Sequence, residues 1–161
     1  MNRKDKVDIQ QVREFEIFQG LMTREIQIIL EVSQSIFCSA GQDVLKQAEL
    51  SMDLFLIISG RLNVSMVYSS MNERRMQKIA VLKSGDIFGE IGFLEGKRRS
   101  ANITSIDDSL VLKIDGMKLH ELFEINQHTG YVMMRNIALV IARRLVDINF
   151  QLRNTDQMGI L

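Results

Sequence analysis

The chain has 161 residues, of which 46% are apolar, and its twenty basic side chains balance twenty acidic ones. This length predicts about one domain, and the zero net charge argues against a nucleic-acid binder that depends on a broad basic face. The single cysteine excludes an internal disulfide, and no apolar run approaches the roughly 20 residues that cross a bilayer, so we expect a soluble cytoplasmic protein.

The N-terminal part of the chain predicts two short helices separated by Gly20. Thr23 is the expected N-cap of the second helix, because its hydroxyl can accept a hydrogen bond from a free N–H of the first turn. Glu25 carries a negative charge that favours the same turn. Apolar residues recur on both sides of the break: Phe15, Ile17, Phe18, Leu21, Ile26, Ile28, Ile29, Leu30 and Val32.

The middle of the chain carries the signals of short β-strands, which are apolar or alternating runs between glycines. The runs that predict strands are residues 54–58, 62–66, 78–82, 102–105 and 110–114. The first two are expected to form a hairpin that turns at Gly60, and the polar residues 68–77 are expected to form a hairpin tip. Strands of this length and spacing predict an antiparallel sandwich or barrel of the jelly-roll kind.

The C-terminal part predicts a short helix from Asp115 or Gly116 and a long helix over about 128–154. The long helix carries apolar residues at intervals of three or four positions, close to a coiled-coil seam. These residues are Met134, Ile137, Ile141, Leu145, Ile148 and Leu152. We expect one side of the helix to cover the barrel and the other to form a homodimer. The expected organisation is a lead-in and barrel over 1–127 and a lid and dimerisation helix over 128–161.

A more specific signature lies near the middle of the chain, over residues 88–101. The run Phe88-Gly89-Glu90-Ile91-Gly92-Phe93-Leu94, followed after a short interval by Arg99-Ser100-Ala101, resembles the phosphate-binding cassette of cyclic nucleotide-binding domains. Further similarity to this family lies at residues 41–49, 53–60, 82–86 and 142–145. The resemblance implies an α+β, mainly β fold: an antiparallel double-stranded β-helix (jelly-roll) barrel with N-terminal helices and a long C-terminal helix, as in catabolite activator and FNR-like sensors.

The resemblance also implies which residues bind the nucleotide: Gly89, Glu90, Ile91, Arg99, Ser100 and Ala101. Their chemistry fits this role. Backbone N–H groups that open a short helix favour an anion, and the planar guanidinium of Arg99 can hold two phosphate oxygens. Glu90 would be repelled by phosphate, so its expected role is to accept a hydrogen bond from the ribose 2′-hydroxyl. Ser100 and the backbone of Ala101 can add donors.

Other interpretations of these residues remain open. Glu90 and Arg99 can form a simple surface ion pair, and residues 97–99 can form a small basic patch. Two positions depart from the family pattern: Arg98 stands where proline often precedes the binding arginine, and Ala48 stands where glycine is frequent. If the turn at Ala48 requires a positive φ, alanine is unfavourable there.

Three residues bear on the identity of the base. With serine at position 100, the chain resembles the cyclic AMP-binding members of the family more than the members that carry threonine there. This favours cyclic AMP over cyclic GMP. Ile148 and Asn149 stand where related sensors approach the purine, and Asn149 can form a hydrogen bond with adenine.

The sequence therefore predicts a cyclic nucleotide-binding regulatory domain that signals through its C-terminal helix to an unknown protein effector. The alternative is a degenerate jelly-roll scaffold that dimerises without a nucleotide. We expect neither an enzyme nor a metal site, since His120 and His128 lie in helical segments without a cluster of ligands around them. The chain ends before the helix-turn-helix module of catabolite activator-like regulators, so this chain alone is expected to contact neither DNA nor a membrane.

Overall fold

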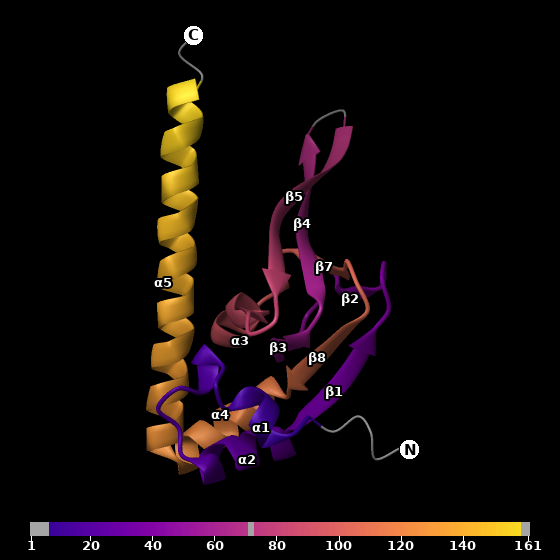
Figure 1. The fold of residues 1–161 in the computed structure, drawn as a ribbon. Coiled ribbons are helices and arrows are strands. Elements are labelled where there is room, and N and C mark those ends of the chain that lie inside the picture. The colour runs from indigo at the N-terminus through magenta and orange to yellow at the C-terminus, as the bar shows by residue number, and fades with distance from the viewer. Residues whose placement is uncertain (1–6, 71–72, 159–161) are drawn as a thin grey trace.

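The computed structural model describes residues 7–70 and 73–158, which form a jelly roll of two four-stranded antiparallel sheets (Figure 1). One sheet has the strand order β1-β8-β3-β6 and the other has the order β2-β7-β4-β5. The strands are β1 (Ser33–Cys38), β2 (Asp43–Leu45), β3 (Leu54–Ser59), β4 (Arg61–Ser70), β5 (Glu73–Lys83), β6 (Ile87–Phe88), β7 (Asn102–Ser105) and β8 (Ser109–Ile114). The predicted jelly-roll fold class is confirmed.

The helices lie at one end and along one side of this barrel. They are α1 (Ile9–Val12), the 3-10 helix η1 (Glu16–Phe18), α2 (Thr23–Glu31), α3 (Glu90–Glu95), α4 (Gly116–Ile125) and α5 (Gln127–Met158). Figure 1 shows α1, α2 and α4 gathered at one end with the first turns of α5, while the rest of α5 runs past the sheets. The long C-terminal helix expected from the sequence is therefore present.

The chain changes sheets at Gly60, so the prediction of a hairpin at this glycine is wrong. β3 pairs with β6 and β8, whereas β4 pairs with β5 and β7. Gly60 has a φ of 91°, and a Cβ at this position would lie only 2.1 Å from Ser109 Oγ. A left-handed backbone packed this closely on a neighbour admits only glycine. The residue therefore makes a corner between sheets instead of a hairpin turn.

The hairpin of this region is formed by β4 and β5, and its strands are longer than predicted. Tyr68, the first residue of the segment that was expected to be a tip, pairs with Arg75 near the other end of that segment. The strands are paired as far as Ser70 and Glu73, and residues 71–72 lie outside the described residues. Figure 1 shows this hairpin extending beyond the rest of the barrel.

Two apolar clusters stabilise the domain. The larger one joins the N-terminal helices, α4 and α5 to the first sheet, and includes Phe18, Ile29, Leu56, Phe93 and Ile137. The smaller one lies between the sheets and includes Cys38, Ile57, Leu62, Phe88 and Val111. Cys38 is fully buried, and burial raises the pKa of its thiol. It packs as a small apolar side chain.

Glu25 attaches α2 to the joint between α4 and α5. Its side chain is 3% exposed, and its Oε1 lies 2.8 Å from both Thr129 Oγ1 and His128 Nδ1. Its Oε2 accepts a hydrogen bond of 2.8 Å from the N–H of Met22, which is the N-cap of α2. Thr23, the cap expected from the sequence, is instead the first residue of the helix. Glu25 therefore connects two segments that are about a hundred residues apart in sequence.

The buried carboxylate of Glu25 predicts a pH-dependent contribution to stability. Burial would raise the pKa of Glu25, but hydrogen bonds from His128, the Met22 N–H and Thr129 outweigh burial and lower it. Because the folded-state pKa lies below the unfolded one, the contribution is complete above the unfolded pKa of about 4.3 and is lost as the pH falls through the folded pKa. We expect Glu25→Gln to lower the free energy of unfolding near neutral pH by about 1–3 kcal/mol.

Urea unfolding between about pH 3 and pH 7 measures this effect, and the loss in Glu25→Gln should shrink at the acidic end. Glu14, whose side chain is 78% exposed, provides the control. Glu14→Gln should change the free energy of unfolding by less than about 0.5 kcal/mol at every pH. A loss in Glu25→Gln that stays constant into the acidic range would show that the charge of Glu25 does not contribute as described.

Candidate functional site

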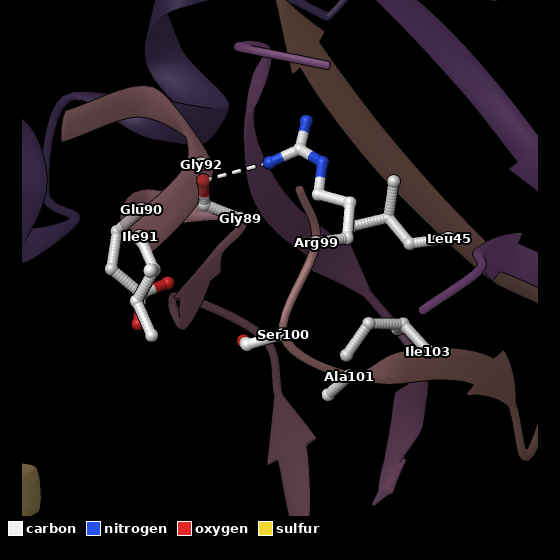
Figure 2. A pocket seen from close by; sticks show the side chains of 9 residues that line it. All are labelled: Leu45, Gly89, Glu90, Ile91, Gly92, Arg99, Ser100, Ala101 and Ile103. Carbon is white, nitrogen blue, oxygen red and sulfur yellow. Dashed lines mark hydrogen bonds between the residues drawn. The ribbon is translucent and has the colours of Figure 1, made fainter. Parts of the chain in front are cut away.

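The six residues predicted to bind a ligand line one cavity, together with Leu45, Gly92 and Ile103 (Figure 2). They come from the start of α3 and from the loop that joins α3 to β7. The cavity has a volume of about 40 Å³. This is far below the roughly 300 Å³ of ordinary small-molecule pockets. In this conformation the cavity has room for a small group of a ligand, of the order of one phosphate, and the remainder would extend over its open side.

Glycines at the start of α3 make room for Arg99. Gly89 is the N-cap of α3 with a φ of 79°, and a Cβ there would lie 2.7 Å from Arg99 Nη1 and 3.0 Å from the Asp53 carbonyl oxygen. A Cβ at Gly92 would lie 2.8 Å from the same nitrogen. In the structure it is the guanidinium that approaches these glycines, so they are needed for its placement.

Arg99 is buried, with 3% of its surface exposed, and its guanidinium makes three hydrogen bonds. Nη1 donates to the Gly89 carbonyl at 2.8 Å, and Nη2 donates to Ser51 Oγ at 2.8 Å and to the Asp53 carbonyl at 2.7 Å. The guanidinium also lies over the ring of Phe55, with Cζ 5.5 Å from the ring centroid. These contacts hold the charged group in one orientation.

The orientation of Arg99 differs from that of a side chain that simply projects into the cavity. Figure 2 shows the guanidinium directed toward Gly89 and away from Ser100 and Ala101. Its Nε–H is buried and has no hydrogen-bond partner among the described residues. Burial lowers the pKa of Arg99 from its usual value, and three carboxylates oppose this effect: Asp53, Glu90 and Glu49. A buried donor without a partner costs about 1–3 kcal/mol, which an anion bound to it would recover.

Glu90 is paired with α5 rather than with Arg99, so the proposed Glu90–Arg99 ion pair is not formed. Its Oε1 accepts a hydrogen bond of 3.0 Å from Arg144 Nη1, and Arg144 Nη2 donates to the Ile87 carbonyl. The Glu90 side chain is 12% exposed, so this ion pair is partly shielded from water. Arg144 was not among the residues predicted from the sequence to form the site. The only signal was the similarity of residues 142–145 to the C-terminal helix of the sensors.

Backbone donors are also available at this cavity. The N–H groups of Glu90 and Ile91 belong to the first turn of α3 and therefore have no partner within the helix. Within the described part of the chain, no other group accepts a hydrogen bond from them. Ser100 is exposed beside them and carries a hydroxyl that can donate. The cavity thus combines donors with a positive charge, an arrangement suited to an anion.

Ala48 has a φ of 70°, so this turn requires the left-handed conformation that the sequence analysis identified as unfavourable for alanine. The turn is held against the site, because the Ala48 N–H donates to the Arg99 carbonyl and Arg98 Nη1 donates to the Ala48 carbonyl. Arg98, which replaces the proline frequent in the family, therefore supports the turn instead of adding a free charge to the cavity. Residues 97–99 do not form a continuous basic patch, since Arg99 is buried and Lys97 pairs with Glu95.

Ala48→Gly is expected to raise the free energy of unfolding by about 0.5–1 kcal/mol, since glycine has no steric penalty at positive φ. Thermal and urea unfolding measure this change. Ala40→Gly is the matched control, because Ala40 is also an exposed loop residue but has no positive φ among the described backbone angles. It should lower the stability slightly. Destabilisation of equal size in both variants would contradict the assigned strain at Ala48.

The two histidines take part in packing and hydrogen bonding. The ring of His120 stacks on Phe93 with 4.4 Å between centroids, and His128 Nδ1 is hydrogen-bonded to Glu25 Oε1. In residues 7–70 and 73–158 there is no group of three or more side chains arranged to hold a metal ion. None of the helices in these ranges has the length and apolar character needed to cross a bilayer.

Comparisons with known proteins agree with this architecture. The cyclic nucleotide-binding domain family matches residues 36–126. The cyclic AMP receptor protein of Thermus thermophilus is 27% identical over 139 residues, which are 84% of this chain and 60% of the receptor. The potassium channel KAT1 of rice, Oryza sativa subsp. japonica, is 27% identical over 86% of this chain and 19% of the channel. The chain thus spans less than two-thirds of either relative.

A solved structure supports the same fold. The crystal structure of a cyclic nucleotide-binding domain from Methylobacillus flagellatus superposes with a TM-score of 0.81 at 18% identity, over 91% of this chain and 83% of that one. The family match begins within β1 and ends just after α4, so it includes all nine residues that line the cavity, whereas Arg144, which pairs with Glu90, lies outside it. The chain belongs to the cyclic nucleotide-binding domain family.

Proposed function

We propose that this chain is a regulatory module that binds cyclic AMP and signals through α5. The observation that carries the proposal is that Arg99, whose buried Nε–H lacks a partner among the described residues, lines one cavity together with Glu90 and Ile91. The N–H groups of Glu90 and Ile91 also have no partner in the described part of the chain. A cyclic phosphate supplies the acceptors that these donors need. Each hydrogen bond to a charged group contributes about 1.5–3 kcal/mol.

The ribose would bind to Glu90. Its Oε1 is occupied by Arg144, which leaves Oε2 to accept a hydrogen bond from the 2′-hydroxyl. Ribose and Arg144 would then share one carboxylate, so that nucleotide binding and the position of α5 influence one another. A ligand shifts the position of α5 only by its difference in affinity between the two arrangements. In this proposal the residues bind the nucleotide and transmit the signal to α5, and they carry out no chemical step.

The distal half of α5 is proposed to form a homodimer. Ile137 in the first half is buried against the barrel, whereas Leu145, Ile148 and Leu152 are 49–59% exposed. Figure 1 shows this part of α5 without a neighbouring element of the chain against most of its length. A solitary helix of about 12–15 residues is marginally stable in water. Pairing with α5 of a second copy would cover the apolar seam, and residues 128–161 would act as lid and dimerisation helix.

The proposal also covers the purine base of the nucleotide and the partner that receives the signal. Ser100 favours cyclic AMP over cyclic GMP, and Asn149, which is exposed on α5, is proposed to approach the adenine when the helix closes over the site. We place the protein in the cytoplasm and propose that its output is received by a protein effector, without contact of this chain with DNA or a membrane.

A second candidate function is a dimerisation scaffold that binds no nucleotide. It is favoured by one observation: three donors of Arg99 and one oxygen of Glu90 already have protein partners. Calorimetric titration with cyclic AMP and then cyclic GMP separates the two candidates. Saturable heat with cyclic AMP, and weaker binding of cyclic GMP, supports the sensor. The absence of heat with both nucleotides would favour the scaffold.

A further inference from the structure

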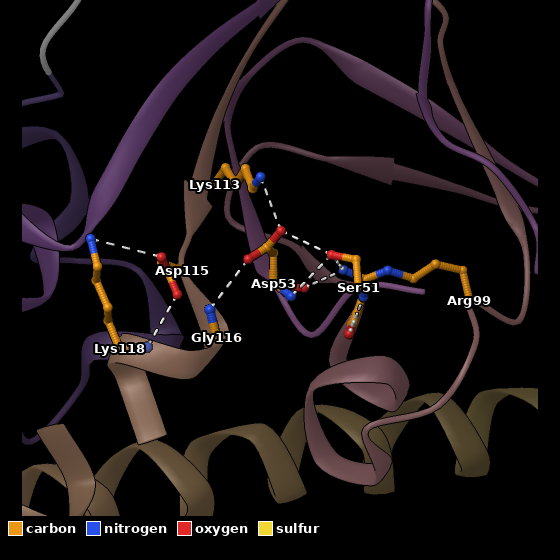
Figure 3. Close-up of polar contacts among 8 residues, drawn as sticks. Ser51, Asp53, Arg99, Lys113, Asp115, Gly116 and Lys118 are labelled. Carbon is orange, nitrogen blue, oxygen red and sulfur yellow. Dashed lines mark hydrogen bonds and ion pairs between the residues drawn. The ribbon is translucent and has the colours of Figure 1, made fainter. Parts of the chain in front are cut away.

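Ser51 lies between the guanidinium of Arg99 and the carboxylate of Asp53 (Figure 3). Its Oγ accepts hydrogen bonds from Arg99 Nη2 at 2.8 Å and from the Asp53 N–H at 3.3 Å, and it donates to Asp53 Oδ2 at 2.9 Å. A serine hydroxyl has one donor and two acceptor positions. All three are used, so the direction of the lone pair that meets Arg99 is fixed.

Asp53 is itself held from the opposite side. Its Oδ2 lies 3.0 Å from Lys113 Nζ, and its Oδ1 accepts a hydrogen bond of 3.3 Å from the N–H of Gly116, the first residue of α4. Burial would raise the pKa of Asp53, but the bonds from Lys113, Ser51 and Gly116 lower it, so the carboxylate is charged at neutral pH. A Cβ at Gly116 would lie 2.1 Å from the Met52 carbonyl oxygen. Residues 51–53 are thus fixed against the start of α4.

Of the three acceptors that orient Arg99, two are backbone carbonyls, of Gly89 and Asp53. Backbone carbonyls are present whatever the side chain. The Oγ of Ser51 is the acceptor that depends on residue identity, and it shares Nη2 with the Asp53 carbonyl. Without it, one N–H of the buried guanidinium would lose its partner, and the group would be held less firmly in its orientation.

We propose that Ser51 is a positioning residue for ligand binding. It holds the guanidinium of Arg99 in the orientation in which the Nε–H has no partner among the described residues, so that an anion can accept a hydrogen bond from it. The inference depends on the proposed function, because it assigns Ser51 a part in nucleotide binding at the same site. Ser51 acts through Arg99 and does not line the cavity. Pre-orientation of this kind improves affinity because the side chain loses less freedom when the ligand binds.

The test is calorimetric titration of the full chain with cyclic AMP. Ser51→Ala is expected to weaken binding about tenfold. Ser51→Thr keeps the hydroxyl, and its affinity should stay within about threefold of that of the unmodified chain. Valine has nearly the shape of threonine but no hydroxyl, so Ser51→Val should lose as much affinity as Ser51→Ala. Ser84→Ala is the control, because Ser84 makes a comparable hydroxyl bond to the Ile58 carbonyl away from the cavity. It should leave binding unchanged, and thermal unfolding should confirm that each variant is folded.

A double-mutant cycle distinguishes positioning from a general structural effect. In an Arg99→Met background, which removes the guanidinium but keeps the stem, Ser51→Ala should change the affinity less than about twofold. The weaker binding of this background can be followed by NMR titration at high cyclic AMP concentration. A loss of equal size in both backgrounds would overturn the inference, as would full affinity in Ser51→Ala or Ser51→Val.

The outcomes also separate this inference from the proposed function. If the unmodified chain binds neither cyclic AMP nor cyclic GMP, the proposed function fails and the role of Ser51 fails with it. If the unmodified chain binds cyclic AMP and Ser51→Val binds it equally well, only the role of Ser51 is wrong.

Discussion

Replacing Arg99 by alanine is expected to weaken the binding of cyclic AMP at least about 100-fold. The substitution removes the positive charge and the buried Nε–H that lacks a partner among the described residues. It also frees Gly89, Ser51 and Asp53 from the contacts that order them around the cavity. Calorimetric titration of the variant measures the loss. Arg99→Lys should lose most of this affinity as well, because an ammonium group cannot reproduce the planar set of donors.

Arg98→Ala is the matched control for this experiment. Arg98 is the adjacent arginine, is exposed, and donates to the Ala48 carbonyl instead of lining the cavity. Its replacement should change the affinity for cyclic AMP less than about threefold, since its charge is exposed and is screened by water and salt. Equal losses in Arg98→Ala and Arg99→Ala would mean that net positive charge, and not the built site, attracts the nucleotide.

Replacing Leu145 by aspartate is expected to convert the proposed homodimer into a monomer, with a rise of at least about 100-fold in the dissociation constant. Leu145 is 57% exposed on the seam of α5, so the single chain can accommodate the change without loss of core packing. In a symmetric dimer the charge is introduced twice into one apolar contact. Sedimentation equilibrium over a range of protein concentrations measures the dissociation constant.

Phe150→Asp provides a control of the same chemistry on the same helix. Phe150 is 65% exposed, and the helical repeat places it on the side of α5 opposite to Leu145. The substitution removes as large an apolar group and adds the same charge, yet it should leave the dimer intact. A dimer that persists in Leu145→Asp but dissociates in Phe150→Asp would place the interface on the other side of α5.

The parts of the fold that depend on nearby residues could be predicted from the sequence. The run of glycines and apolar residues over 88–96 predicts the short helix α3 from nearby residues alone, whereas the two-residue strand β6 before it was not among the predicted strands. The apolar repeat of α5 likewise predicts its own helix. The positive φ at Ala48 could also be anticipated, because the family pattern marks a turn at that position.

Features that depend on distant partners could not be predicted in this way. The strands on either side of Gly60 carry the same pattern whether they pair with each other or join different sheets, and the packing of Ser109 against Gly60 decides between these alternatives. The acceptors that orient Arg99 include Ser51 and Asp53, which lie 48 and 46 residues away. Arg144 lies 54 residues from Glu90 and pairs with it only after α5 has packed. No local period or motif encodes these contacts.

The proposed ligand site is tested most directly by two-dimensional amide NMR of the isotope-labelled chain during titration with cyclic AMP. We predict that the largest shifts belong to the N–H signals of Glu90, Ile91 and Ser100 and to the Nε–H signal of Arg99. If these four signals stay in place at saturating nucleotide, or if only signals remote from the cavity move, cyclic AMP does not bind where the structure indicates.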